Sequence, residues 1–197
     1  MITTRDELKL YLQEDKKAMH IHKNRPSYSD VIWKYVIALR HNEYHYNVRN
    51  NRRGIISLYH RVMHKLWDYR MFRLGLQTGF SICRNSCGKG LQLAHIGPII
   101  INGTLGDYCR VHVGVNIGVK AGTSSERPII GSGVYIGPGA KIFGAVKIAD
   151  HIAIGANSVV NKDFGEPNIS IAGIPAKKIS DKSAKGLLYE PELGKVD

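Results

Sequence analysis

The sequence predicts a mainly β protein, a parallel helix of short strands preceded by an α-helical N-terminal region. Over the first 80 of 197 residues, apolar side chains recur at helical spacing. After Gly79 the aliphatic residues recur every six positions, which is typical of a hexapeptide-repeat β-helix. We therefore expect an α-helical domain over residues 1–80, a β-helix over 81–180 and a C-terminal tail over 181–197.

The first helix is predicted from its start signal. Thr4 and Glu7 have the spacing of a capping box, in which each side chain bonds to the backbone N–H of the other residue. Apolar residues follow in a loosely helical pattern up to His20. Pro26 and Ser27 then lie in a polar stretch that breaks the helix.

Two further helices are expected before the β region. Ser29 or Asp30 caps a second helix that runs from Val31 to about Arg40. A third helix is predicted from about 55 to 76, on apolar residues at helical spacing: Ile55, Tyr59, Val62 and Leu66.

In the β region every sixth residue is apolar over two runs. The residue directly after each of these apolar residues is often Gly, and the residue two positions before it is small or apolar. A coil of about three hexads cannot bury its own inner face, so we expect the coils to stack on one another with these side chains inside. The two runs are Cys87, Leu93, Ile99, Leu105, Val111 and Ile117, and then Ile130, Ile136, Ile142, Ile148, Ile154 and Val160.

The six-residue period fails between the two runs. Residues 120–129 contain a polar, turn-forming stretch where the register is lost. We expect this segment to leave the stack as an exposed loop, and loops carried on a rigid scaffold are frequent places for functional residues.

Composition places the chain among globular proteins. Hydrophobic residues make up 43% and charged residues 22%, which excludes a disordered chain. Three cysteines are too few, and odd in number, for a disulfide framework; Cys87 and Cys109 are expected to be inert core residues. No apolar run approaches the roughly 18 residues of a membrane span, and the charged N-terminus has no apolar signal core. We expect a cytoplasmic protein.

The chain is strongly basic. It has 28 Lys and Arg against 16 Asp and Glu, a net charge of +12. This excess favours an anionic partner. Only the net charge points to nucleic acid, because no nucleic-acid-binding motif is recognised, so no nucleic-acid partner is expected.

The β region resembles the serine acetyltransferase branch of the hexapeptide acyltransferases, and looks most like the serine acetyltransferase-like proteins encoded with surface-polysaccharide genes. The resemblance implies a left-handed β-helix, a homotrimer whose trimers could pair, acetyl-CoA as donor, and active sites between neighbouring prisms. The matching segments are 88–95 (GKGLQLAH), 126–131 (ERPIIG), 134–144 (VYIGPGAKIFG), 154–160 (IGANSVV) and 172–177 (AGIPAK).

The resemblance assigns the catalytic base to His95. A hydroxyl acceptor needs a base before it attacks a thioester, and His is suited to this at neutral pH. His95 lies two positions after the inward Leu93, so its side chain is expected to face outward. The alternative is an ordinary surface His. His112 lies 17 residues on, one coil above, and either assists or packs; His151 is expected to be structural.

Departures from the family pattern bear on the acceptor. The family has Asp directly before the base, where this chain has Ala94, and a second Asp about fifteen residues upstream, where it has Phe80-Ser81-Ile82. The loop Arg-His pair of the family aligns with Glu126-Arg127. Glu126, Arg127 and His112 are therefore the candidate acceptor-binding residues. We expect a sugar hydroxyl of a surface polysaccharide or its precursor, with free serine as the alternative and a non-catalytic assembly module as a second one.

The resemblance also implies CoA contacts. Residues 172–177 match the family's terminal coil, where backbone amides and a Lys contact CoA; the alternative is a polar cap on the end of the solenoid. Gly permits close backbone approach and Lys is a suitable charge for a phosphate. The cofactor-binding candidates are Gly118, Val119, Lys120, Pro138, Ala156, Ala172, Gly173 and Lys177.

Two His pairs raise the question of a metal. His41 and His45, and His60 and His64, are each four residues apart on predicted helices. Residues 41–45 do not form HExxH, because the Glu is displaced. In a chain with nine His such pairs arise easily, and no metal is expected.

A basic run lies in the helical region. It either meets an anionic glycan or a membrane-linked substrate, or is a solvated helix face. Its members are Arg49, Arg52, Arg53, Arg61, Lys65, Arg70 and Arg73, with Asp68 among them as the one acid.

Overall fold

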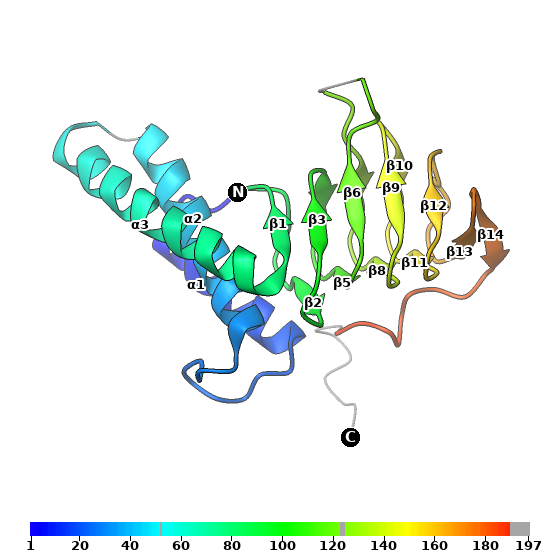
Figure 1. Ribbon diagram of the computed structural model, residues 1–197, viewed down its shortest axis with the longest axis horizontal. Helices are drawn as coiled ribbons and strands as arrows, with labels where there is room; N and C mark the ends of the chain where they lie inside the picture. The colour runs from blue at the N-terminus through cyan, green and yellow to red at the C-terminus, as the bar shows by residue number, and fades with distance from the viewer. Residues whose placement is uncertain (52, 123–124, 190–197) are drawn as a thin grey trace.

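The computed structural model describes residues 1–51, 53–122 and 125–189. Three helices pack together at one end, and an elongated stack of short strands extends from them (Figure 1). The helices are α1 Arg5–Ala18, α2 Val31–Asn51 and α3 Gly54–Thr78. The strands are β1 Phe80–Ile82, β2 Gln92–Ala94, β3 Ile99–Ile101, β4 Thr104–Leu105, β5 Arg110–His112, β6 Asn116–Gly118, β7 Ile129–Ile130, β8 Tyr135–Ile136, β9 Lys141–Phe143, β10 Lys147–Ile148, β11 Ala153–Ile154, β12 Val159–Val160, β13 Ser170–Gly173 and β14 Ala176–Ser180.

Helix α1 begins as the sequence predicts. The Glu7 backbone N–H donates to Thr4 Oγ1 at 3.1 Å, and the Thr4 backbone N–H donates to Glu7 Oε2 at 3.0 Å. This capping box satisfies two donors that the first turn of a helix leaves without partners. The helix ends at Ala18, two residues before the predicted end.

Helix α2 runs eleven residues beyond its predicted end at Arg40. Most of its second half is polar but buried, and tertiary hydrogen bonds satisfy several of these side chains. Asn42 Nδ2 donates to Asp68 Oδ1 at 3.0 Å, and Asn47 Nδ2 donates to Asn85 Oδ1 at 2.9 Å. A search for apolar periodicity misses such a segment because its buried face is made of polar residues.

Helix α3 lies where it was predicted, but the apolar stripe that predicted it faces solvent. The side packed toward α2 carries small and polar residues, including Ser57, His60 and His64. Ile55 is 82% exposed, and Tyr59, Val62 and Leu66 are each more than half exposed. The periodicity therefore identified the helix without identifying its buried face.

The strands form a parallel β-helix of three sheets. Their orders are β1-β3-β6-β9-β12, β10-β7-β4 and β14-β13-β11-β8-β5-β2, and all pairs are parallel except β13 with β14. All twelve predicted hexad residues are buried, none more than 7% exposed. Burial raises the pKa of Cys87 and of Cys109 to about 12, as expected of inert core thiols.

The predicted loop leaves the stack between β6 and β7, at the upper edge of the sheet in Figure 1. Residues 120–122 and 125–127 are exposed, as expected, while residues 123 and 124 lie outside the described part. Residues 190–197 of the predicted tail also lie outside it.

The helices are joined to the first coil through Arg40, which is fully buried. Its Nε donates to Asp15 Oδ2 at 2.7 Å, and Nη1 donates to Glu43 Oε2 at 3.1 Å. The guanidinium also donates to the carbonyl oxygens of Cys87 and Gly88. One side chain thus satisfies two buried carboxylates and two backbone acceptors of the first coil.

None of the described helices is both long and apolar enough to cross a membrane.

We expect Arg40→Met to destabilise the protein by about 3–5 kcal/mol, because it leaves Asp15 and Glu43 buried without their cation. Arg84→Met is the matched control. Arg84 pairs with Asp68 at 3.1 Å, and both side chains are at least 36% exposed, so its loss should cost no more than about 1 kcal/mol. Chemical denaturation of the three proteins measures both effects, and equal losses would contradict the assigned role of Arg40.

Candidate active site

His95 follows β2 at a turn of the β-helix. Its φ is +67°, a left-handed conformation that His adopts more readily than most residues. The backbone leaves the strand here, so the imidazole is exposed and faces away from the aliphatic stack, as predicted. Gly97 completes the turn at φ +142°, and a Cβ there would lie 2.4 Å from Val113 Cγ2.

His112 lies one coil from His95, as the spacing of 17 residues predicted. The register pairs Ala94 with His112, and the two imidazole centroids are 6.1 Å apart. On the next coil Tyr135, which is in register with Arg110, also contacts His112, with 5.0 Å between the ring centroids. The sequence analysis did not single out Tyr135, although its place directly before the inward Ile136 marks it as an outward residue of the same sheet.

The environment of His112 favours a neutral imidazole. Its side chain is buried, and Nε2 has no hydrogen-bond partner among the described residues. Burial, followed by the charges of Arg110 and His95, lowers the pKa of His112 below its usual value. At neutral pH His112 can therefore offer an unoccupied ring nitrogen to a neighbouring hydroxyl.

No carboxylate bonds to His95 within residues 1–51, 53–122 and 125–189. Ala94 precedes it and is buried, at 9% exposure. Phe80 packs edge-on against Tyr35, with 5.2 Å between ring centroids. Where the resemblance places family carboxylates, this chain thus has the buried methyl group of Ala94 and the stretch Phe80-Ser81-Ile82, of which only Ser81 is exposed.

Four candidate CoA-contact positions lie along the same edge as His95. The strand register aligns Leu93 with Ile136, Ile154 and Ile171 through Val111. The residues two positions after these strand residues therefore stack from coil to coil, and His95 is the first of them. Pro138 and Ala156 are exposed on this edge, and the Asn157 N–H donates to the Pro138 carbonyl at 2.8 Å. Ala172 and Gly173 continue the row at the end of the stack.

Lys177 lies beside this row. It pairs with Ala172 across the β13–β14 hairpin, and its side chain is exposed. Among the described residues Lys177 makes no ion pair, whereas the adjacent Lys178 is held by Glu166 and Asp181, each at 2.6 Å. Of the two ammonium groups, that of Lys177 is the one available to a phosphate.

The remaining candidates lie elsewhere in the chain. Gly118 ends β6, Val119 and Lys120 follow it, and Glu126 and Arg127 lie on the exposed loop. These five residues are at the edge where the strands of the β1-β3-β6-β9-β12 sheet end, and His95 is at the edge where they begin (Figure 1). Within one chain the structure does not bring them to His95.

The two His pairs and the basic run of the sequence analysis lie in the helical region. His45 Nδ1 lies 2.8 Å from His60 Nδ1, but no group of three or more His, Cys, Asp or Glu among the described residues is arranged to hold a metal ion. Of the basic run, Arg61, Lys65, Arg70 and Arg73 are exposed on α3. Arg49 contacts His64 at 3.1 Å, and Arg52 lies outside the described residues.

We expect His112 to titrate below pH 6.5 in an NMR pH titration of its imidazole resonances. Arg110→Gln should raise that midpoint, because it removes a neighbouring positive charge. Arg25→Gln, the same change on the exposed segment before α2, should leave the midpoint in place. A midpoint at or above 6.5 in the unsubstituted protein would contradict the described environment of His112.

Comparison with known proteins identifies relatives for this chain. No family model matches it. A serine acetyltransferase of Synechococcus elongatus is 33% identical over 132 residues, 61% of this chain and 54% of that protein. A serine acetyltransferase of Staphylococcus epidermidis is 30% identical over 190 residues, 92% of this chain and 79% of that protein. The chain spans about half the length of the first three such relatives, 52–56%.

Solved structures agree with the predicted fold. The serine acetyltransferase of Brucella abortus in complex with coenzyme A superposes with a TM-score of 0.62 at 26% identity, over 91% of this chain and 70% of that one. A serine O-acetyltransferase of Brucella melitensis, described as a bacterial transferase hexapeptide repeat protein, gives 0.58 at 26% identity, over 90% and 69%. The left-handed β-helix with N-terminal helices is thereby confirmed. The chain belongs to the serine acetyltransferase family.

Proposed function

We propose that this protein transfers an acetyl group from acetyl-CoA to a hydroxyl oxygen. Family membership supports the reaction class. The observation that carries the proposal is the shared edge: His95 is exposed on the same row of turns as Pro138, Ala156 and Gly173, the positions that match CoA contacts in the family. A base and a thioester donor can meet along this row.

In the proposed reaction His95 takes the proton of the acceptor hydroxyl. The oxygen then attacks the thioester carbonyl carbon and forms a tetrahedral intermediate, whose oxyanion needs hydrogen-bond donors. Collapse of the intermediate breaks the C–S bond, and the proton held by His95 passes to the departing CoA sulfur. The products are the O-acetyl ester and CoA, and the imidazole returns to its neutral state.

We further propose that the active site is shared between chains of a homotrimer. Five candidate residues lie at the edge opposite His95, so they could contact the acceptor or the donor only at the His95 edge of another copy. They are Gly118, Val119, Lys120, Glu126 and Arg127. Acetyl-CoA would then contact Lys177 and the His95 edge of one chain and the loop edge of its neighbour.

L-serine is the acceptor that the comparisons favour. The relatives bear the name of serine acetyltransferase, and nothing in the comparisons supports a polysaccharide acceptor. The sequence analysis favoured a sugar hydroxyl, and one observation keeps it as the second candidate. Within the described residues no carboxylate lies at His95 to hold the serine ammonium group. We therefore propose serine as acceptor, with its ammonium contributing little to recognition.

The acceptor can be identified by comparing compounds that differ in one group. With acetyl-CoA, we expect L-serine to be acetylated. We expect 3-hydroxypropanoate, which lacks the ammonium, to retain kcat/KM within about tenfold, because a site without a charge partner for the ammonium loses little when that group is absent. CoA release is the measurement. A loss of more than a hundredfold for 3-hydroxypropanoate would show that a carboxylate binds the ammonium; acetylation of a sugar nucleotide but not serine would establish the second candidate.

Replacing the base should abolish transfer without unfolding the chain. We expect His95→Asn to lower kcat by about 10²–10⁴-fold, the usual contribution of a positioned base. Asn tolerates the left-handed backbone at this position, so the thermal midpoint and CoA binding should be unchanged. His20→Asn is the matched control, because His20 is also exposed and has φ +54°. Retention of more than a tenth of the activity in His95→Asn would show that another group is the base.

A further inference from the structure

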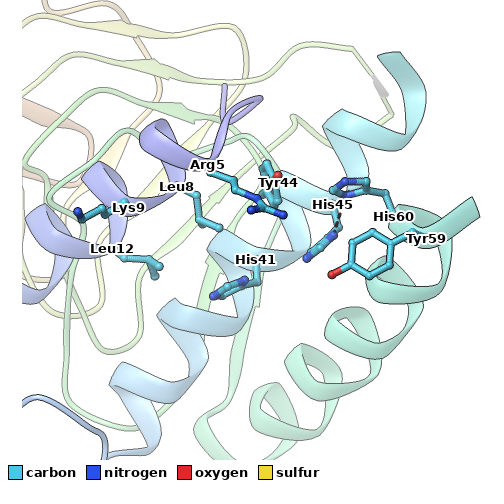
Figure 2. A pocket seen from close by; sticks show the side chains of 9 residues that line it. All are labelled: Arg5, Leu8, Lys9, Leu12, His41, Tyr44, His45, Tyr59 and His60. Atoms are coloured by element: carbon cyan, nitrogen blue, oxygen red, sulfur yellow. Dashed lines mark hydrogen bonds between the residues drawn. The ribbon is translucent and has the colours of Figure 1, made fainter. Parts of the chain in front are cut away.

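A pocket lies in the helical region, away from the proposed active site. It has a volume of about 380 Å³, and all three helices line it (Figure 2). Such a volume is in the range of small-molecule sites. Its lining residues are Arg5, Leu8, Lys9 and Leu12 from α1, His41, Tyr44 and His45 from α2, and Tyr59 and His60 from α3.

The charged residues of this pocket are all basic. None of the nine lining residues is Asp or Glu. Arg5 and Lys9 are exposed and make no ion pair with any described residue. The Arg5 side chain extends across the pocket toward Tyr44 and His45 (Figure 2). A cation that spans a concave surface without a counter-ion creates a favourable potential for an anion.

Two buried imidazoles add hydrogen-bonding capacity. His45 and His60 are 5% and 7% exposed, and the bond between their Nδ1 atoms, 2.8 Å long, is the one hydrogen bond that either makes with described residues. Since one ring must donate and the other accept, the neutral pair has one Nε2–H donor and one Nε2 acceptor left over. One added proton converts the pair into a cation with two Nε2–H donors.

Positive surroundings keep this pair neutral. Burial, followed by the charges of His60, His41 and His64, lowers the pKa of His45 to about 4, and burial with the charge of Arg5 lowers that of His60. The titratable groups facing the pair are Arg5 and Lys9 from α1, His41 and Tyr44 from α2, and Tyr59 and His64 from α3. A bound anion would offset this repulsion and favour the protonated imidazoles.

The rest of the lining is apolar or aromatic. Leu8 and Tyr44 are buried, each at 8% exposure, and Tyr59 lines the pocket from α3 at 54% exposure. His45 is in edge contact with both tyrosines, at centroid distances of 5.0 Å and 6.0 Å. An inorganic ion would leave this surface uncovered, whereas a ligand with an aromatic body would cover it.

We propose that this pocket binds a small phosphorylated compound with an aromatic body, its phosphate held by Arg5 and the His45–His60 pair. The site is separate from the transfer reaction proposed above and does not depend on it. Neither substrate nor CoA needs to occupy it.

The test uses phenyl phosphate as probe, with inorganic phosphate and phenol as its two halves. Isothermal titration of the full-length protein should show that phenyl phosphate binds at least tenfold more tightly than either half. Arg5→Gln should weaken phenyl phosphate binding about tenfold or more. Arg25→Gln, an equal charge change on the exposed segment before α2, should leave it within twofold.

NMR separates this site from any anion binding elsewhere. Saturating phenyl phosphate should raise the titration midpoints of the His45 and His60 imidazoles, and the rise should be lost in Arg5→Gln. No binding at millimolar phenyl phosphate, equal weakening by Arg25→Gln, or binding without a change at His45 and His60 would each overturn the proposal. Equal affinity for inorganic phosphate would overturn the aromatic part of it.

Discussion

The coil-to-coil register is the constraint on which the rest of the structure depends. Each strand is two to five residues long and buries only the side chains that point inward, so a coil is stable only against its neighbours. Register is therefore held by the aliphatic stack, and a slip by one residue would turn every inward side chain outward. The same register aligns the turns. His95, Pro138, Ala156 and Gly173 form one row because the aliphatic residues two positions before them, Leu93, Ile136, Ile154 and Ile171, are stacked.

The helical region depends on a different kind of interaction. Its connection to the first coil is the buried guanidinium of Arg40, which is costly to desolvate and is compensated only by complete pairing. Asp15 Oδ1 also accepts from the Leu91 N–H at 2.8 Å, and Glu43 Oε1 from the Asn85 N–H at 2.8 Å. The carboxylates that neutralise Arg40 therefore also satisfy backbone donors of the coil. The first coil is thus joined to α1 and α2 by this polar network, together with apolar contacts, since Tyr35, Val36 and Leu39 belong to the same buried cluster as the β-helix core.

The β-helix could be predicted from the sequence because its period is written in apolar residues. The helical region could not be predicted to the same extent. The end of α2 was missed because Asn42 and Asn47 are buried through hydrogen bonds to Asp68 and Asn85, partners distant in the chain. His112 was found by counting 17 residues from His95, whereas Tyr135 was not, because the register aligns it with Arg110 and not with His112. The His45–His60 pair joins two helices, so spacing within either helix pointed only to His41 and His64.

The distribution of candidate residues over two edges limits what one chain can do. A general base must come within hydrogen-bond reach of the proton that it removes, and the donor carbonyl must lie beside the same oxygen. In the proposed reaction the His95 edge would supply the base, and the exposed Pro138, Ala156 and Gly173 on the same edge would contact the donor. The loop edge has no His among its candidate residues, but it has Lys120, Glu126 and Arg127 as charged groups. Bringing the two edges together in neighbouring copies would place Arg127 of one chain opposite the base of the other, so one chain could bind the carboxylate of serine while the other deprotonates its hydroxyl.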